Sequence, residues 1–268
     1  MRKKTLSLAA LIICVSMLAS GCGQEISQTA NITVETTEEP TEATTEEPEP
    51  ELTERAKELL EQNPDTVGYV VVDGTEVDNP VVQTTDNEYY LSVGFDGEEF
   101  RAGTVFMDYQ ATIGPYTDEW SENIVLYGHN MADNTMFGSL RRYRQDPEYY
   151  KEYPFITFSS NYADYTYVMI GLVITSGNSD ADFPYWRMID LDDEETFDSY
   201  ISSVEEKNMI DNPIDVTYGD SLLTLSTCYS DDDNSRFIIV ARRLRDDEDT
   251  ESLLALIQGD DEEEEVEE

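Results

Sequence analysis

The 268-residue sequence has few positively charged side chains, with 16 Lys and Arg against 59 Asp and Glu, so its net charge at pH 7 is −43. This composition argues against a nucleic-acid partner, because broad polyphosphate binding needs clustered cationic side chains that displace counterions. The excess of acidic residues is not confined to the two ends of the chain, since residues 55–247 still carry 38 acids against 13 bases. Such a surface resists self-association and attracts cationic or amine-bearing partners.

Long apolar runs are also lacking, and the main one spans only Leu6–Ala19. It is shorter than the roughly 20 residues that a membrane-spanning helix needs. Basic residues at 2–4 precede it and Ser20-Gly21-Cys22 follows it, which is typical of a secretory signal. The cysteine resembles that of a bacterial lipobox, with Ala19 where Leu is usual. We expect residues 1–22 to be a signal peptide and Cys22 to be the lipidated first residue of the mature chain. An uncleaved signal anchor is the alternative, and both place the protein on the outer face of the cytoplasmic membrane.

Cysteine and histidine are both scarce, with three Cys and one His. Cys14 lies in the signal and Cys22 is assigned to lipidation, so Cys228 has no cysteine left with which to form an internal disulfide. Cys228 is therefore either an inert buried thiol or a reactive one. Neither a metal-ligand spacing nor a regular Asp-x-Asp-x-Asp-Gly calcium loop occurs, so we expect no metal and no cofactor.

The remaining chain divides by composition. Residues 23–50 are almost entirely Thr, Glu, Pro, Ala and other polar residues, which predicts an extended, disordered spacer that cannot bury enough apolar surface to fold. Residues 260–268 are eight acids and one Val, and we expect a disordered acidic tail over 248–268. This leaves 51–247 as one domain with a substantial core.

Within this domain, short segments rich in Val, Ile, Thr, Tyr and Phe predict eight strands. They are 68–72, 81–83, 104–107, 123–127, 155–158, 165–175, 222–227 and 236–243. Helices are expected at Leu52–Leu60, with Thr53 as the N-cap, at Glu194–Lys207 between two late strands, and as a short turn at Phe137–Arg144. Many strands and few helices favour a barrel or a sandwich.

Three side chains lie where predicted strands meet loops. His129 follows the strand 123–127, and Cys228 follows the apolar strand 222–227. Arg236 opens the last strand, and hairpin pairing would place it beside Cys228. A Cys, a His and a guanidinium together form a nucleophilic site. Each residue also has a plain structural explanation: a hydrogen-bonded His, a small buried Cys, or an Arg that pairs with one of the many acids.

Three motifs together resemble those of the sortases, the cysteine transpeptidases of the Gram-positive cell surface. They are Tyr127-Gly128-His129-Asn130-Met131, Thr224-Leu225-Ser226-Thr227-Cys228 and the segment Ser235–Arg242. The resemblance spans roughly residues 52–245 and is most like class B. It implies a mainly β fold, a closed eight-stranded barrel with an N-terminal helix and a helix inserted between late strands. Ser92 departs from the Asn that is common in the class, and the lipobox departs from the usual uncleaved anchor.

The resemblance also implies a mechanism and partners. Cys228 would attack the carbonyl after a Thr in the C-terminal sorting signal of a surface protein, giving a thioester. His129 would act first as general acid and then as base, and Arg236 would hold the substrate backbone and the oxyanion. The acceptor would be an amine of a peptidoglycan cross-bridge or of a pilin. The residues expected to line the substrate groove are Ser92, Asn130, Ser226, Thr227 and Tyr229.

Two alternatives remain open at the level of the sequence. A cysteine peptidase would hydrolyse the same acyl-enzyme with water, since the two reactions differ only in the nucleophile. A non-catalytic surface lipoprotein could instead use a sortase-like barrel to bind a partner. The 17 Tyr make a binding groove conceivable, although those within the predicted strands, such as Tyr165 and Tyr167, alternate as barrel-filling residues do.

Overall fold

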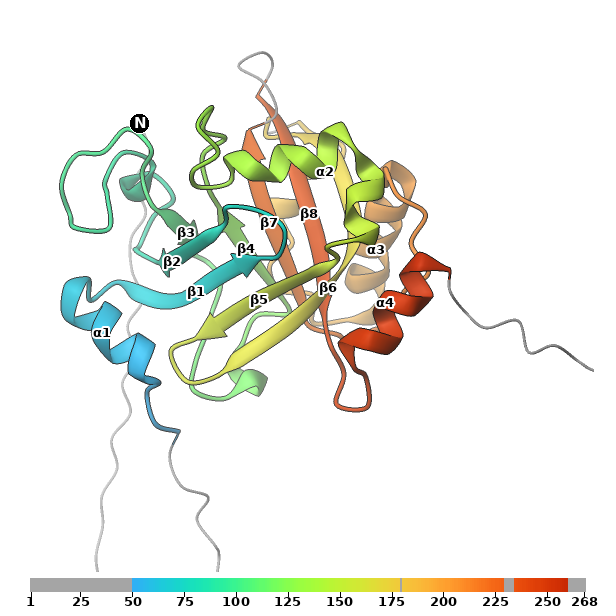
Figure 1. Cartoon of the computed structure of the whole chain (residues 1–268), viewed down its shortest axis with the longest axis horizontal. Coiled ribbons are helices and arrows are strands. Elements are labelled where there is room, and N and C mark those ends of the chain that lie inside the picture. The colour runs from blue at the N-terminus through green and yellow to red at the C-terminus, as the bar shows by residue number, and fades with distance from the viewer. Residues whose placement is uncertain (1–49, 179, 229–233, 260–268) are drawn as a thin grey trace, which may run out of the picture. The chain divides into compact units, whose positions relative to one another are not determined.

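The core of the chain is a closed β-barrel (Figure 1). The computed structural model describes residues 50–178, 180–228 and 234–259. Around the barrel the strands follow the order β1-β2-β3-β4-β7-β8-β6-β5. Their bounds are β1 Thr66–Val72, β2 Asp78–Val82, β3 Val105–Met107, β4 Asn123–Tyr127, β5 Phe155–Ser160, β6 Asp164–Ser176, β7 Leu222–Cys228 and β8 Ser235–Arg243. The predicted mainly β fold with an eight-stranded closed barrel is confirmed.

Two parallel pairs interrupt an otherwise antiparallel barrel. β2 pairs with β3 and β4 pairs with β7 in parallel, whereas β1–β2, β3–β4, β7–β8, β6–β8, β5–β6 and β1–β5 are antiparallel. Side chains such as Val125, Leu225 and Ile239 are fully buried in the resulting core. Because β4 and β7 run in the same direction, the loops that follow both strands leave the barrel at the same edge.

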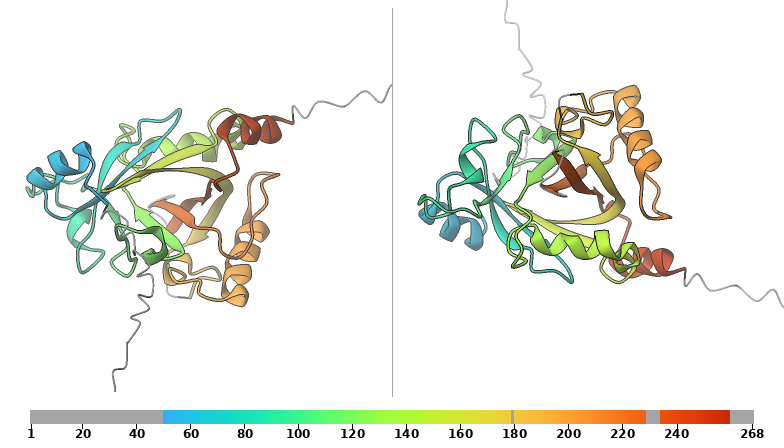
Figure 2. Two further views of the ribbon diagram at one scale, coloured as in Figure 1. Left: turned by 90° about the horizontal axis from the view of Figure 1, so that it is seen from below. Right: turned by 90° about the horizontal axis from the view of Figure 1, so that it is seen from above.

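The helices pack outside the barrel, as the end-on views in Figure 2 show. They are α1 Glu54–Gln62, α2 Arg141–Gln145, α3 Glu194–Lys207 and α4 Thr250–Gln258, accompanied by short 3₁₀ turns. The expected cap of α1 is present, because Thr53 Oγ1 accepts a hydrogen bond from Ala56 N–H at 3.1 Å. The N-terminal helix and the helix inserted between β6 and β7 are confirmed, and the short turn expected at Phe137–Arg144 appears as a 3₁₀ turn that leads into α2.

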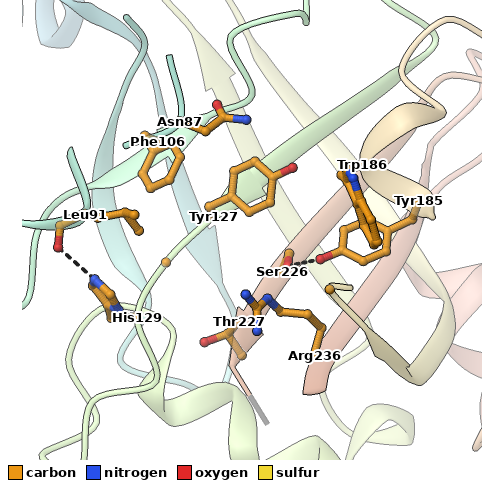
Figure 3. A pocket seen from close by; sticks show the side chains of 12 residues that line it. Asn87, Leu91, Phe106, Tyr127, His129, Tyr185, Trp186, Ser226, Thr227 and Arg236 are labelled. Carbon is orange, nitrogen blue, oxygen red and sulfur yellow. Dashed lines mark hydrogen bonds between the residues drawn. The ribbon is translucent and has the colours of Figure 1, made fainter. Parts of the chain in front are cut away.

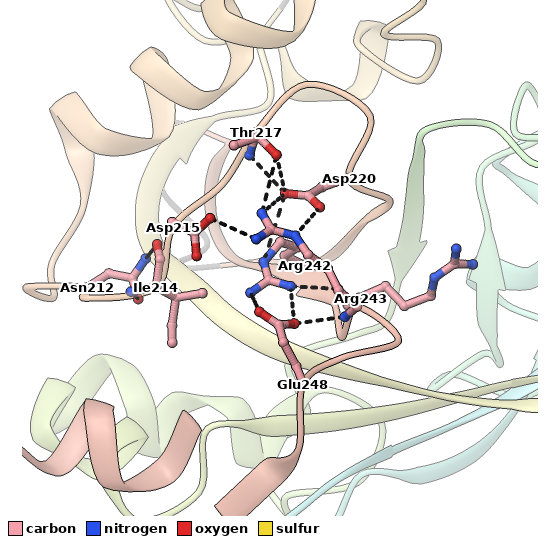
Figure 4. A network of polar contacts seen from close by, with 9 residues as sticks. Asn212, Ile214, Asp215, Thr217, Asp220, Arg242, Arg243 and Glu248 are labelled. Carbon is pink, nitrogen blue, oxygen red and sulfur yellow. Dashed lines mark hydrogen bonds and ion pairs between the residues drawn. The ribbon is translucent and has the colours of Figure 1, made fainter. Parts of the chain in front are cut away.

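The structure of the C-terminal residues differs from the prediction made for them. We expected disorder from residue 248 onward, but α4 covers Thr250–Gln258 and buries Leu253 and Ile257. The fully buried Arg242 of β8 donates hydrogen bonds to both carboxylate oxygens of Glu248, at 2.6 and 2.8 Å (Figure 4). Asp249 caps the helix by accepting from Ser252 N–H at 2.9 Å. The acids that suggested a solvated tail therefore fix this helix to the barrel.

Several expectations concern residues outside the described part of the chain. The signal peptide at 1–22 with its lipidated Cys22, nearly all of the spacer at 23–50, and the acidic run at 260–268 belong to this group. Within the described residues, no helix has the length and apolar character to span a membrane.

Candidate active site

The sheet register brings the three predicted catalytic positions to one edge of the barrel. Tyr127 at the end of β4 pairs with Ser226 of β7, and Gly128 N–H donates to the Ser226 carbonyl at 3.2 Å. Cys228 is the last residue of β7, and its backbone pairs with Arg236 of β8. The hairpin pairing expected between Cys228 and Arg236 is therefore present. His129 follows β4 by two residues, so all three positions belong to neighbouring strands or to the loop after one of them.

A pocket of about 250 Å³ opens at this edge (Figure 3). Its walls come from both sides of the barrel mouth and from the loop that follows β6. The lining residues are Asn87, Leu91, Phe106, Tyr127, Gly128, His129, Gly177, Tyr185, Trp186, Ser226, Thr227 and Arg236. In this view Thr227, which directly precedes Cys228, lies between His129 and Arg236.

The loop after β4 holds the His129 ring in a defined position. Its Nε2 lies 2.8 Å from the Leu91 carbonyl oxygen, and a carbonyl can only accept, so Nε2 carries the proton in this arrangement. The His129 carbonyl in turn accepts from Phe137 N–H at 3.0 Å. Gly128 permits this packing, because a Cβ at that position would lie 2.6 Å from Phe137 Cγ. The residues on either side of Gly128 are thereby directed into the pocket.

Arg236 enters the pocket from the start of β8. The side chain is partly buried, and its Nη1 donates to the Ser235 carbonyl at 3.2 Å. Gly177 makes room for the guanidinium, since a Cβ there would lie 3.1 Å from Arg236 Cζ. A guanidinium has five N–H donors in a fixed fork, so Arg236 can still donate to a carbonyl or an oxyanion that enters the pocket.

The opposite wall contains buried polar groups. Tyr127 donates its hydroxyl to Asp108 Oδ2 at 2.8 Å. Burial, together with the nearby Asp108, raises the pKa of Tyr127 well above its ordinary value, although Arg236 acts in the opposite direction. The Tyr127 phenol therefore stays neutral across the physiological pH range. On the floor, the hydroxyls of Tyr185 and Ser226 are 2.6 Å apart and hydrogen-bonded.

The predicted groove residues divide into three groups. Ser226 and Thr227 line the pocket, and Thr227 Oγ1 is buried with no hydrogen-bond partner among the described residues. Ser92 and Asn130 do not line it; their neighbours Leu91 and His129 do. Tyr229 lies outside the described residues, and so does Cys22, the predicted lipidation site.

Several pocket residues were not singled out from the sequence. They are Asn87, Leu91, Phe106, Gly177, Tyr185 and Trp186. Tyr127 was visible only as part of the motif around His129. Leu91 is the neighbour of Ser92, which the sequence predicted to line the groove, but the others lie in segments far from the three motifs. Only the barrel closure, which brings β3 and the loops after β2 and β6 to the same mouth, identifies them.

Comparison with known proteins places this chain in one family. The model of the sortase domain matches residues 70–244. The chain therefore belongs to the sortase family. Its similarity within the family is to class B: it is 31% identical over 172 residues to sortase B of Listeria monocytogenes and 30% identical over 166 residues to sortase B of Staphylococcus aureus. These alignments cover 64% and 62% of this chain, and 66% and 64% of the two relatives.

Solved structures agree with this placement. The structure of a Staphylococcus aureus sortase B–substrate complex superimposes with a TM-score of 0.64 at 27% identity, covering 72% of this chain and 86% of that chain. A sortase B structure from B. anthracis gives a TM-score of 0.61 at 29% identity, covering 74% of this chain and 89% of that chain. The predicted class B resemblance is confirmed by both kinds of comparison.

Proposed function

We propose that this chain is a cysteine transpeptidase of the sortase B type that cleaves a C-terminal sorting signal after a Thr and transfers the protein to an amine. The pairing of Cys228 with Arg236 across the β7–β8 hairpin, at the pocket that His129 and Arg236 line, is the observation that carries the proposal. The similarity to a sortase B whose structure is a substrate complex supports a peptide as the occupant of this pocket.

In the proposed reaction, the Cys228 thiolate attacks the scissile carbonyl and the C–N bond breaks to leave a thioester. His129 donates a proton to the departing amine, and in the second half it removes one from the incoming amine. Arg236 donates to the substrate backbone and to the negative charge that develops on the carbonyl oxygen. Thr227, which lines the pocket next to Cys228, forms part of the surface against which the peptide lies.

The acceptor and the location form part of the same proposal. An amine of a peptidoglycan cross-bridge or of a pilin is the proposed acceptor, and the acidic surface of the domain favours the approach of a cationic group. An N-terminal tether would hold the enzyme at the outer face of the cytoplasmic membrane, where surface proteins emerge. Hydrolysis by water is the competing outcome for the same thioester.

Intact mass measurement tests the proposal directly. Residues 51–268 are incubated with a pool of NPxTx- and LPxTx-type peptides, with and without an added amine. We expect a mass increase that hydroxylamine removes, and transfer of the acyl group to the amine when it is present. Release of only the hydrolysed peptide, even with abundant amine, would identify a peptidase. A chain that forms no adduct and whose cysteine a thiol-reactive probe does not label would instead be a binding protein.

Replacing His129 or Arg236 with Ala should lower peptide turnover strongly. We expect about 10²- to 10⁴-fold from the loss of acid–base catalysis at His129 and about 10²- to 10³-fold from the loss of an oxyanion donor at Arg236. Arg243→Ala is the matched control, because Arg243 lies on the same strand with its guanidinium over the Tyr165 ring at 5.4 Å. Steady-state kinetics should show near-parental turnover for this control, and a similar rate for His129→Ala or Arg236→Ala would assign that residue a structural role.

A further inference from the structure

Asp108 is a buried acid that the proposed mechanism does not use. It directly follows β3, and only 1% of its surface is exposed. One carboxyl oxygen, Oδ2, accepts two hydrogen bonds, from Asn87 Nδ2 and from the Tyr127 hydroxyl, both at 2.8 Å. The other, Oδ1, accepts from Gln110 N–H at 2.9 Å. Asp108 therefore joins two residues that line the pocket from different segments of the chain.

These contacts determine which way the two pocket groups face. Asn87 Oδ1 accepts from Tyr109 N–H at 3.0 Å while its Nδ2 donates to Asp108, so its amide cannot turn over without losing both bonds. The Tyr127 proton is committed to Asp108, which leaves the phenol oxygen as an acceptor. Asn87 Nδ2 retains a second hydrogen. The pair can therefore offer a ligand one N–H donor and one oxygen acceptor, which complements an amide group.

We propose that Asp108 is a positioning residue that fixes the Asn87 amide and the Tyr127 hydroxyl, so that this wall of the pocket binds an amide group of the peptide substrate. The inference rests on the proposed function, because the ligand it describes is the peptide part of the sorting signal. Asp108 itself lies behind the wall and contacts the substrate only through Asn87 and Tyr127. Its effect is on the binding of peptide and not on the bond-breaking steps at Cys228.

Kinetics of two Asp108 variants in the full-length protein test this role. Asp108→Ala removes the shared acceptor, and we expect KM for the peptide to rise about tenfold, the effect of a net loss near that of one hydrogen bond, with kcat within twofold of the parent. Asp108→Asn can place its amide oxygen where Oδ2 lies and keep the bonds from Asn87 and Tyr127, while its amide nitrogen takes the place of the oxygen that accepts from Gln110 N–H. KM should therefore recover most of the loss, although the bond from Gln110 is lost. An unchanged KM in Asp108→Ala, or a fall confined to kcat, would overturn the proposal.

A stability control separates positioning from general loss of folding. Glu248→Gln weakens a different, partly buried polar contact, the one with Arg242, which lies outside the set of pocket-lining residues. It should lower the thermal midpoint while leaving KM at the parental value. If Glu248→Gln raised KM as much as Asp108→Ala does, the effect of Asp108 would reflect stability alone.

Structures of the substrate-free parent and of Asp108→Ala decide the matter independently of activity. We expect the Asn87 amide or the Tyr127 ring to adopt a different position once the shared oxygen is gone. Should both side chains keep their places, Asp108 does not position them, whatever the kinetics show. A parent that turns over no peptide and forms no thioester would count against the proposed function, while the structural comparison would still judge the role of Asp108.

Discussion

Replacing Cys228 with Ala is expected to abolish the thioester and to lower peptide turnover by at least about 10⁴-fold, because removal of a catalytic nucleophile leaves only the contribution of binding and oxyanion stabilisation. The fold should persist, since Cys228 ends β7 and its strand is held by backbone pairing to both β4 and β8. The readouts are the hydroxylamine-sensitive mass increase, the rate of peptide cleavage and the far-ultraviolet circular dichroism of the variant.

The composition of the chain makes this experiment easy to interpret. Cys228 is the single cysteine between residues 51 and 268, so every thiol-dependent adduct on that fragment reports on it. Cys228→Ser is the matched control: it is close in shape, but its hydroxyl is far less acidic than a thiol, so its turnover should also be very low. Parental turnover in Cys228→Ala would exclude the thioester mechanism and move the proposal to a binding role.

The elements that place the catalytic positions could be predicted because their signals are local. The strand over 123–127 and the helix over 194–207 have the same bounds in the structure as in the sequence prediction. A run of β-branched and apolar residues ended by Gly128 defines the first, and an acidic first turn with apolar residues at helical spacing defines the second. The hairpin between Cys228 and Arg236 follows from two apolar strands that are separated by a short polar loop.

The polar wall of the pocket could not be predicted, because its contacts are not local. Asn87 and Tyr127 meet through Asp108, with 21 and 19 residues of sequence separation from it. Whether Asp108 is buried depends on the closure of the barrel around it, and its sequence neighbours do not reveal this. An isolated Asp in an acidic chain is otherwise most simply explained as a solvated surface group.

The C-terminal helix was missed for a related reason. High acidity from residue 248 onward is typical of a disordered tail, yet two of these acids have defined partners. Glu248 pairs with Arg242, whose side chain is completely buried, and Asp249 caps α4. A buried Arg needs a carboxylate, but the sequence does not show which of the many acids provides it. The pairing of Arg242 with Glu248 becomes evident only in the folded structure, where the segment between β8 and α4 brings Glu248 to Arg242.

The second large effect is expected from Glu248→Ala. This change leaves the Arg242 guanidinium in the protein interior without its bidentate partner, and breaking a buried pair on one side typically costs about 3–5 kcal/mol of unfolding free energy. Asp220 lies 4.0 Å from Arg242 Nε but is itself held by Arg245, so it does not replace Glu248. Urea unfolding followed by circular dichroism measures the loss, and a change below about 1 kcal/mol would contradict the buried pair.

Acid should remove the stabilisation that the Glu248–Arg242 pair gives to the parent protein. The hydrogen bond from Arg242 holds the pKa of Glu248 below its ordinary value, despite the opposing effect of burial. A carboxyl whose pKa is lower in the folded state stabilises the fold above its unfolded pKa, and this stabilisation is lost as the pH falls through the folded pKa. The difference in stability between the parent and Glu248→Ala should therefore be constant near neutral pH and shrink in acid.

A double variant distinguishes the pair from the packing around it. Arg242→Met with Glu248→Leu removes both charges and retains apolar volume, so its stability should exceed that of Glu248→Ala and approach that of the parent, because no unpaired charge remains buried. Its unfolding free energy should also lose the acid-dependent component that Glu248 contributes. If the double variant were as unstable as Glu248→Ala at neutral pH, packing of these side chains, and not the unpaired guanidinium, would account for the loss.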